Sequence, residues 1–274
     1  MLGGGGVTGI AWETGLLHGL AEAGVDLTEA DLLIGTSAGS VVAAQLAGGV
    51  PLEELYADQL RPPDGEIPAR LTSAMILRYL VAFALPGTGR RKRARLGRAA
   101  LRARTVSEAE RRAVFEGRLA QRGWPDRLLR VTAVNTADGA FAVFDRDSGA
   151  PFLDAVAASC AVPLVWPPVT IDGHRYMDGG IRSTANADLA TGYERVVVLA
   201  PITKALSRAT RPDAQVASLD ARSILLSPDA EALKAIGGNI LDPARRAPAA
   251  EAGRAQAVAV AEAVREVWDS QSTR

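Results

Sequence analysis

The chain has few of the residues that build disulfides and metal centres. Its 274 residues include one cysteine, Cys160, and two histidines, His18 and His174. One cysteine excludes an internal disulfide framework and any cysteine-rich zinc site. Two histidines disfavour a histidine-based metal cluster. We therefore expect no metal site, and we interpret Cys160, which lies among alanines, as a small packed residue.

The chain also lacks an excess of charge of either sign and a long apolar run. Lys and Arg total 31, as do Asp and Glu, so no global field draws the protein to nucleic acid or to a membrane. Glycines follow Met1 and Leu2, without the leader of a signal peptide. The longest apolar stretch, 75–85, is interrupted by Arg78 and is too short to span a bilayer. This composition predicts a soluble, cytoplasmic protein whose length suits a single α/β domain.

The most informative stretch is a short apolar run followed by a glycine-framed serine. Residues 32–34 indicate a buried strand, residues 35–39 read GTSAG, and small apolar residues then follow at helical spacing. Strand, sharp turn and helix are the context of a nucleophile elbow, in which Gly35 and Gly39 leave the backbone the room that the turn needs. Ser37 would then stand at a helix N-terminus, where unpaired N–H groups favour negative charge. The alternative is an ordinary strand-to-helix turn in which the serine is only an N-cap.

Four glycines, 3–6, open the chain ahead of a helix-patterned segment over 10–20. Such a row of backbone N–H groups can bind an anion or a developing oxyanion. Gly4, Gly6 and Gly9 also match the G-x-G-x-x-G fingerprint of dinucleotide-binding proteins. That fingerprint needs a strand before it and an acid at the end of the next strand. Only two residues precede the glycines, so the sheet begins with a stub or the native start lies upstream, and nucleotide binding remains a minor alternative.

A segment between these motifs and the second half of the chain reads as a partial helical cap over 51–125. It contains an apolar helix over 72–85 and then a basic run. An apolar helix beside a cationic run could contact an anionic lipid surface, so peripheral membrane contact through 72–104 is one interpretation. A solvated, mobile segment is the other, because no clean apolar face runs through the basic part. The run has no aromatic residue to stack on bases, which argues against nucleic acid. Its members are Arg90, Arg91, Lys92, Arg93, Arg95, Arg98, Arg102 and Arg104.

Elsewhere, apolar runs alternate with turn signals, and we find no internal repeat. Ser107 and Glu110 match a capping box, and Asp138-Gly139 indicates a hairpin. We expect strands over 128–135, 140–144, 169–171, 175–177, 195–200 and 223–226, with further helices over 51–60, 107–123, 152–161, 227–237 and 242–268.

A serine nucleophile needs a base, and the histidine count limits the choice. Hydrolases with a Ser-Asp-His triad carry the histidine late in the chain, yet none follows His174. A Ser–carboxylate pair is therefore favoured. Asp178 is the best carboxylate, because Gly179 and Gly180 let its backbone approach the serine and an apolar strand holds it. A carboxylate is a weak base, so partial burial would have to raise its proton affinity.

With these motifs in this order, the sequence resembles the patatin-like phospholipases, which are Ser–Asp dyad acyl hydrolases. Residues 4–9 (GGGVTG) are similar to the family's glycine loop, 35–39 to its G-x-S-x-G elbow and 178–180 to its D-G-[GA] motif. Residues 158–163 resemble the stretch before that acid. The likeness covers about residues 1–200, and Thr8 departs from it where the family usually carries Arg or Lys. The resemblance implies Ser37 as nucleophile, Asp178 as base, an oxyanion hole around Gly4, Gly5, Gly6 and Ala38, and motif glycines Gly9, Gly35, Gly39, Gly179 and Gly180.

We therefore predict a three-layer α/β/α sandwich with a mostly parallel central sheet, in which 227–274 forms a C-terminal helical segment. The predicted function is hydrolysis of a lipid ester (a phospholipid, lysophospholipid or acylglycerol) through an acyl-enzyme, with neither a metal nor an organic cofactor. A catalytically weak scaffold of the same fold that binds lipid or a partner is the alternative.

Overall fold

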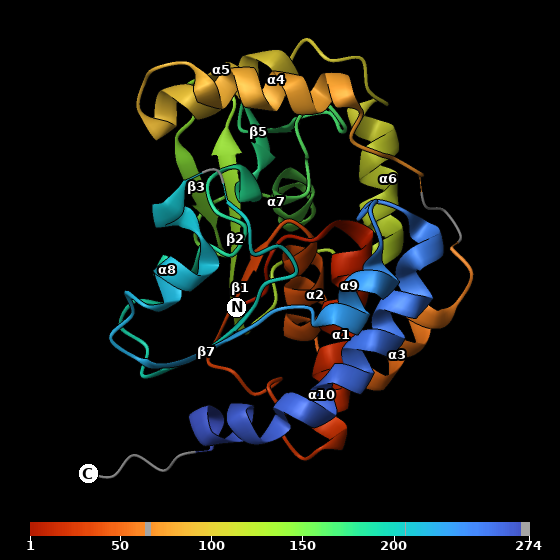
Figure 1. Cartoon of the computed structure of the whole chain (residues 1–274). Coiled ribbons are helices and arrows are strands. Elements are labelled where there is room, and N and C mark those ends of the chain that lie inside the picture. The colour runs from red at the N-terminus through yellow and green to blue at the C-terminus, as the bar shows by residue number, and fades with distance from the viewer. Residues whose placement is uncertain (64–66, 206, 270–274) are drawn as a thin grey trace.

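The computed structural model describes residues 1–63, 67–205 and 207–269 (Figure 1). Five helices follow one another between the first and second strands, and helices and strands are interspersed in the second half of the chain. In order, the elements are α1 (Gly6–Glu22), β1 (Leu32–Thr36), α2 (Ala38–Ala47), α3 (Leu52–Leu60), α4 (Ser73–Ala84), α5 (Gly89–Ala100), α6 (Glu108–Arg118), β2 (Leu128–Asn135), β3 (Phe141–Phe144), α7 (Phe152–Ser159), β4 (Val169–Ile171), β5 (His174–Asp178), β6 (Arg195–Leu199), α8 (Pro212–Val216), β7 (Arg222–Leu226), α9 (Ala230–Ile236) and α10 (Arg246–Trp268), with single 3₁₀ turns η1 (Gly179–Ile181), η2 (Ala187–Ala190), η3 (Arg208–Thr210) and η4 (Pro243–Arg245).

The central sheet is mixed. Strands β1 and β2 pair in parallel, as do β6 and β7, whereas β2 pairs antiparallel with β3 and β5, and β5 with β4. Leu2 joins the two parallel pairs, because it forms parallel bridges to Gly35 and Leu199. The α/β prediction is confirmed. The sheet is less parallel than predicted, because the tight turns at Asp138-Gly139 and Asp172-Gly173 can join only antiparallel strands.

Both faces of the sheet are packed. On β2, the side chains of Leu129, Val131 and Ala133 lie in the main hydrophobic core, which also includes residues of α1, α2, α7 and α10. Val134, one residue further along, faces the other way into a second cluster, against which side chains of α4 and α5 pack. This period of two along a strand means that helices cover both faces.

Helix α1 is held by a close contact with α10 that the sequence did not signal. A Cβ atom on Gly15 would overlap the carbonyl of Ala250, and one on Gly253 would overlap the carbonyl of Trp12. The two helices therefore pack backbone to backbone, which only glycine permits at these positions. This contact fixes the direction of α1, whose first residues carry the glycine loop.

The predicted cap region contains α3, α4, α5 and α6, and most of the basic run forms α5. The Thr88 side chain caps α5 by accepting a hydrogen bond from the Arg91 N–H group. Four small or apolar residues of α5 are buried: Ala94, Leu96, Gly97 and Ala100. The apolar face of α5 is thus short and consists mostly of small residues. For this reason the sequence pattern, which is dominated by arginines, did not indicate it. Figure 1 shows α4 and α5 crossing the upper end of the sheet.

Most of the remaining boundaries lie within about three residues of the predicted ones. Helix α6 begins at the predicted capping box of Ser107 and Glu110 but ends at Arg118, before Gly123, and α10 begins at Arg246. Residues 64–66 of the predicted cap and 270–274 of the predicted C-terminal segment lie outside the described residues. Within the described part, no helix is both long and apolar enough to cross a bilayer.

Candidate active site

The turn between β1 and α2 is strained at Ser37. Its backbone has φ 53° and ψ −122°, a conformation that a residue with a side chain rarely adopts. The flanking glycines are sterically required, because a Cβ on Gly35 would overlap the backbone of Ser40 and one on Gly39 would overlap the carbonyl of Leu2. The turn thus has the strained geometry of a nucleophile elbow, and the Ser37 side chain stands at the N-terminus of α2.

The structure brings Asp178 to this serine. Asp178 is the last residue of β5, is 4% exposed, and lies in the sheet opposite Ala133 of β2. Its carboxyl group accepts a hydrogen bond from the Gly180 N–H group at 2.7 Å and interacts with the Ser37 side chain. Burial raises the pKa of Asp178 from its ordinary value of 3.8 to about 7, although the interactions with Ser37 and Gly180 act to lower it. A carboxyl group with this pKa can accept a proton near neutral pH.

The glycine loop lies beside the same serine. A Cβ on Gly4 would be 3.3 Å from the Cβ of Ser37. The Gly4 N–H group donates to the carbonyl of Thr184 at 2.7 Å, so it is not free to bind a substrate oxygen. Among the described residues, the N–H groups of Gly5, Gly6 and Ala38 have no protein acceptor. N–H groups without an acceptor among the described residues thus lie at three of the four positions expected for an oxyanion hole.

Two residues of the α7 end fix the serine backbone. The Ser37 N–H group donates to the Ser159 hydroxyl at 2.9 Å, and the Cys160 thiol donates to the Ser37 carbonyl at 3.1 Å. Burial raises the pKa of Cys160 to about 12, so the thiol keeps its proton. Cys160 is a packed residue, as expected, with an added hydrogen-bonding role. Their position in the stretch 158–163 was the only sequence signal for this contact.

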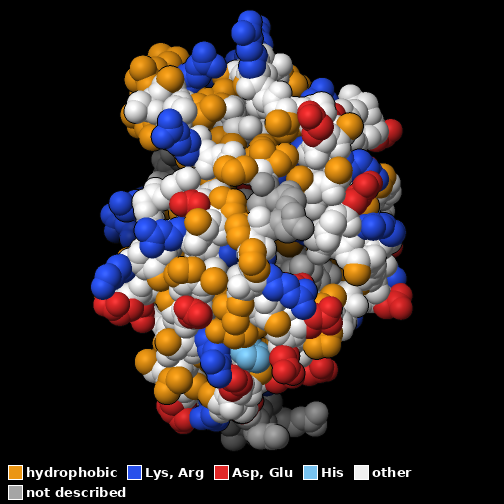
Figure 2. All heavy atoms as spheres, turned by 90° about the vertical axis from the view of Figure 1, so that its right-hand side faces the viewer, with side chains coloured by type: hydrophobic (Ala, Val, Ile, Leu, Met, Phe, Trp, Pro, Cys, Tyr) orange, Lys and Arg blue, Asp and Glu red, His pale blue; other side chains and the backbone are white. Residues whose placement is uncertain are grey.

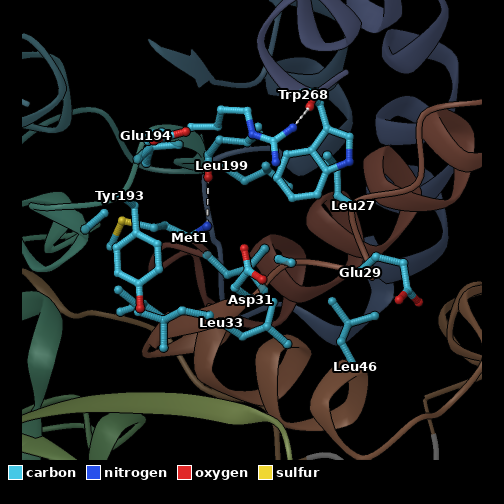
Figure 3. Close-up of a pocket in the computed structure, with 18 of the residues that line it drawn as sticks. Met1, Leu27, Glu29, Asp31, Leu33, Leu46, Tyr193, Glu194, Leu199 and Trp268 are labelled. Atoms are coloured by element: carbon cyan, nitrogen blue, oxygen red, sulfur yellow. Dashed lines mark hydrogen bonds between the residues drawn. The ribbon is translucent and has the colours of Figure 1, made fainter. Parts of the chain in front are cut away.

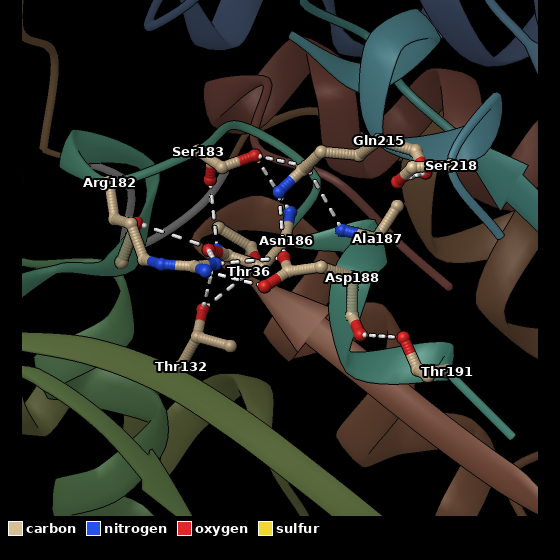
Figure 4. Close-up of polar contacts among 11 residues, drawn as sticks. Thr36, Thr132, Arg182, Ser183, Asn186, Ala187, Asp188, Thr191, Gln215 and Ser218 are labelled. Carbon is tan, nitrogen blue, oxygen red and sulfur yellow. Dashed lines mark hydrogen bonds and ion pairs between the residues drawn. The ribbon is translucent and has the colours of Figure 1, made fainter. Parts of the chain in front are cut away.

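A buried polar network connects the turn at Ser37 with the turn after Asp178 (Figure 4). Asn186, in the left-handed conformation at φ 51°, donates from its amide nitrogen to the hydroxyl of Thr36 at 3.0 Å and to that of Thr132 at 3.3 Å. The same nitrogen lies 3.5 Å from the carbonyl of Gly179. A single side chain thereby ties the strand before Ser37 to the residue after Asp178. The sequence analysis did not single out Asn186.

A buried carboxyl group supports the glycine loop from below. Glu13, on α1, is fully buried and its Oε1 atom accepts the Gly3 N–H group at 2.8 Å, whereas its Oε2 atom has no partner within the described structure. Burial raises the pKa of Glu13 well above its usual range. Thr8 holds the loop from the other side, because its hydroxyl contacts the carbonyls of Gly5 and Ile240 at 3.4 Å and 3.3 Å.

The space next to Ser37 is small and is bordered by two arginines. A cavity of about 30 Å³ lies against Ser37 and Ala38, which is little more than the room for one water molecule. Arg111 and Arg118 of α6 line it, and the Arg111 guanidinium lies 4.0 Å from the ring centre of Trp166. A bulky substrate must therefore displace part of the covering chain, which includes Ile67.

A second cavity does not include the serine in its lining (Figure 3). Its volume is about 410 Å³, and it is lined by the starts of β1 and β6, with Tyr193 and Trp268 in its walls. The Ser37 turn follows the opposite end of β1. Ligands of open α/β sheets bind beyond the carboxyl ends of the strands, so the small cavity, and not this one, is the candidate active site.

Neither histidine is placed to act as the base. The His18 ring stacks on the Tyr56 ring, and its Nε2 atom lies 3.5 Å from Oε1 of Glu22. His174 is exposed at the start of β5, four residues before Asp178.

Comparison with known proteins gives one family match. The model of a family described as patatin-like phospholipase matches residues 1–191. No curated protein matches the sequence. Among solved structures, VipD from Legionella pneumophila is similar with a TM-score of 0.45 and 13% identity over 95% of this chain and 66% of that one. The type III effector protein ExoU has a TM-score of 0.41 and 16% identity over 96% and 52%. The chain thus spans less than two thirds of either structure, and scores this low add nothing to the family match.

Proposed function

Because the chain belongs to the patatin-like phospholipase family, we propose that it hydrolyses lipid esters through an acyl-enzyme formed on Ser37. One observation carries the proposal. The side chain of a strained, buried serine interacts with a carboxyl group that has a pKa near neutrality, beside N–H groups that have no acceptor among the described residues. A structural serine requires none of these three features.

The proposed reaction has two halves. Asp178 accepts the Ser37 proton while the oxygen attacks the ester carbonyl, and the carbonyl oxygen becomes an oxyanion held by the N–H groups of Gly5, Gly6 and Ala38. The proton then passes to the leaving alcohol. In the second half, Asp178 takes a proton from water, the resulting hydroxide attacks the acyl group, and Ser37 regains its proton as the fatty acid leaves.

The charge of the cavity favours an ester that carries a phosphate group. The Arg111 and Arg118 guanidinium groups border the space next to Ser37 and suit recognition of a phosphate oxyanion. Thr8 stands where relatives usually have a cation, but its hydroxyl contacts hold the loop without one. We therefore propose a phospholipid or lysophospholipid in preference to a neutral acylglycerol.

Hydrolysis of p-nitrophenyl esters tests the proposal. Ser37→Ala should lower kcat by at least about 10⁴-fold and Asp178→Asn by about 10³-fold, while the exposed Ser148→Ala variant retains full activity. Thermal unfolding of each variant separates loss of chemistry from loss of fold. Activity that survives Ser37→Ala would remove the serine from the mechanism.

The alternative of a catalytically silent scaffold predicts a different pattern. Such a protein would bind lipid vesicles but neither hydrolyse esters nor react with a fluorophosphonate, which modifies only an activated serine. Nucleotide binding through the glycine loop would likewise leave the serine unlabelled.

A further inference from the structure

Helix α4 presents an apolar face to solvent. On this face, Ile76 is 47% exposed, Leu77 and Leu80 are each 60% exposed, and Val81 is 50% exposed. These residues recur at the spacing of one helical stripe. The opposite stripe of α4 is packed, because Met75, Tyr79 and Phe83 contact the cluster that contains Met177 of β5. Helix α4 is therefore packed against the protein on one side, while its leucines are exposed on the other.

A stripe of arginines on α5 runs alongside that apolar face. Arg91, Arg95 and Arg98 are three or four positions apart and therefore share one side of α5, and Arg102 follows in the turn after the helix. Arg95 donates hydrogen bonds to the carbonyls of Leu85 and Pro86 and so joins the end of α4 to α5.

Between the two helices lies a groove of about 610 Å³. Apolar side chains of α4 and arginines of both helices form its walls together. They are Leu77, Arg78, Val81, Ala82, Leu85, Arg95, Arg98, Ala99 and Arg102.

The charge around this face is strongly one-sided. Residues 67–107 contain ten Lys and Arg residues and no Asp or Glu, although the whole chain is neutral. Among the described residues, no carboxylate forms an ion pair with Arg78, Arg98 or Arg102. Figure 2 shows hydrophobic and basic side chains together at the top of the molecule, the end at which Figure 1 places α4 and α5. Concentrated positive charge beside exposed leucines is the complement of an anionic bilayer, whose headgroups are negative and whose interior is apolar.

The face also adjoins the candidate active site. The Tyr79 hydroxyl donates to the carbonyl of Pro163 at 3.0 Å, and the Asp178 N–H group donates to the carbonyl of Ala161 in the same loop. Ile67, which precedes α4 in the chain, lines the cavity at Ser37. A surface that held α4 would therefore bring the mouth of this cavity close to it.

From these observations we propose that the α4–α5 face docks on an anionic phospholipid bilayer, with the leucines of α4 in the acyl region and the arginines of α5 at the headgroups. The proposal deepens the proposed function by stating where the lipid substrate is met, but docking itself requires no catalysis.

Vesicle co-sedimentation with the Ser37→Ala protein tests docking without turnover. We expect binding to phosphatidylcholine vesicles that contain about one third phosphatidylserine, and at least about tenfold weaker binding to pure phosphatidylcholine. Leu77→Asp with Leu80→Asp should weaken binding to the anionic vesicles by at least about tenfold, because the apolar contact is lost. Arg98→Glu with Arg102→Glu should have a similar effect on anionic vesicles and little on neutral ones.

Two controls match these changes. Arg208→Glu with Lys234→Glu alters net charge equally at exposed positions outside the face, and Val258→Asp replaces an apolar residue of α10 that is 79% exposed. Both should bind vesicles as the parent does. Equal weakening by the controls, or equal binding of the parent to neutral and anionic vesicles, would overturn the proposal. So would a dimer in sedimentation velocity that Leu77→Asp with Leu80→Asp dissociates, since the face would then be covered by a second copy.

The result is independent of the proposed chemistry. If the wild-type protein binds anionic vesicles but hydrolyses no ester and takes up no fluorophosphonate, docking stands and the proposed function fails. If it hydrolyses soluble esters but binds no vesicle, the reverse holds.

Discussion

The two turns that carry Ser37 and Asp178 differ from the α4–α5 face in how they are held. At the turns, backbone lies against backbone, and methyl groups on Gly39 or Gly179 would overlap Leu2 or Thr132. On α4, by contrast, most large side chains of the outer stripe meet solvent. The comparison shows that glycines in close backbone contact fix the geometry of the two turns, so larger residues cannot replace them. The exposed positions of α4 carry no such packing constraint, so their side chains can be chosen for contact with a surface.

The largest effect should come from crowding the serine turn. Gly39→Ala places a methyl group inside the carbonyl of Leu2, so we expect a loss of at least about 3 kcal/mol of unfolding free energy, or no soluble protein. Gly117→Ala is the control, because Gly117 is an exposed helical position with open space around it, and the same change should stabilise the protein by about 0.5–1 kcal/mol. Urea denaturation measures both. A Gly39→Ala protein as stable as the parent would contradict the claim that close backbone contacts at the turn require glycine.

Removing the tie between the two turns should have the next largest effect. Asn186→Ala leaves the hydroxyls of Thr36 and Thr132 without their amide donor, and we expect a loss of about 2–4 kcal/mol of stability together with a fall in kcat. The exposed Thr191, whose hydroxyl donates to the Asp188 carbonyl at the edge of the same region, provides the control Thr191→Ala, with an expected loss under about 1 kcal/mol. Equal losses of stability at the two positions would contradict the role of Asn186 in connecting the two turns.

Burial of Asp178 should cost stability in a pH-dependent way. Its pKa is about 7 in the folded protein against an ordinary 3.8, so between these values the folded state keeps a proton that the unfolded state releases. Stability from this group is therefore full at low pH and falls as pH rises toward 7. Asn cannot ionise, so Asp178→Asn should be more stable than the parent by about 2 kcal/mol at about pH 8, and by little at about pH 4. Chemical denaturation at the two pH values measures the difference, and a constant offset would contradict the raised pKa.

Headgroup preference should change when charge is removed beside the serine. Arg118→Gln should lower kcat/KM for a phospholipid by about tenfold while that for a neutral acylglycerol changes less, because the guanidinium lines the cavity at Ser37. Arg146→Gln, on an exposed turn, is the control. An equal fall for both substrates would assign Arg118 to the fold instead.

The smallest effect should come from the outer face of α4. Leu77→Asp with Leu80→Asp removes no buried contact, so the unfolding free energy should change by less than about 0.5 kcal/mol per substitution. A large loss of stability in denaturant would show that the face is part of the core.

The features that sequence predicted best were those with local causes. The turn glycines around Ser37, the capping box at Ser107 and the hairpin at Asp138-Gly139 each depend on neighbouring residues, and the structure contains all three. Contacts between distant segments could not be predicted this way. The fit of Gly15 against Ala250 becomes visible only when α1 and α10 are packed together.

Within the site, the sequence could predict residues that lie in motifs, but not which distant groups are their hydrogen-bond partners. Ser37 and Asp178 were predicted through their motifs, and the structure places them in contact. Gly4 was expected to donate to an oxyanion, but its N–H group is already bound to Thr184, an acceptor 180 residues away in the chain. Asn186 has no motif of its own, and its importance follows only from the hydroxyls that converge on it.

The central claim is that Asp178 activates Ser37, and the pH dependence of fluorophosphonate labelling tests it most directly. We predict a single adduct, mapped by peptide mass spectrometry to Ser37, with a labelling rate that rises with pH and levels off above a pKa of about 7. Asp178→Asn should lose that rise and label slowly at every pH. An adduct on another residue, or an Asp178→Asn protein that labels at the wild-type rate, would contradict the account.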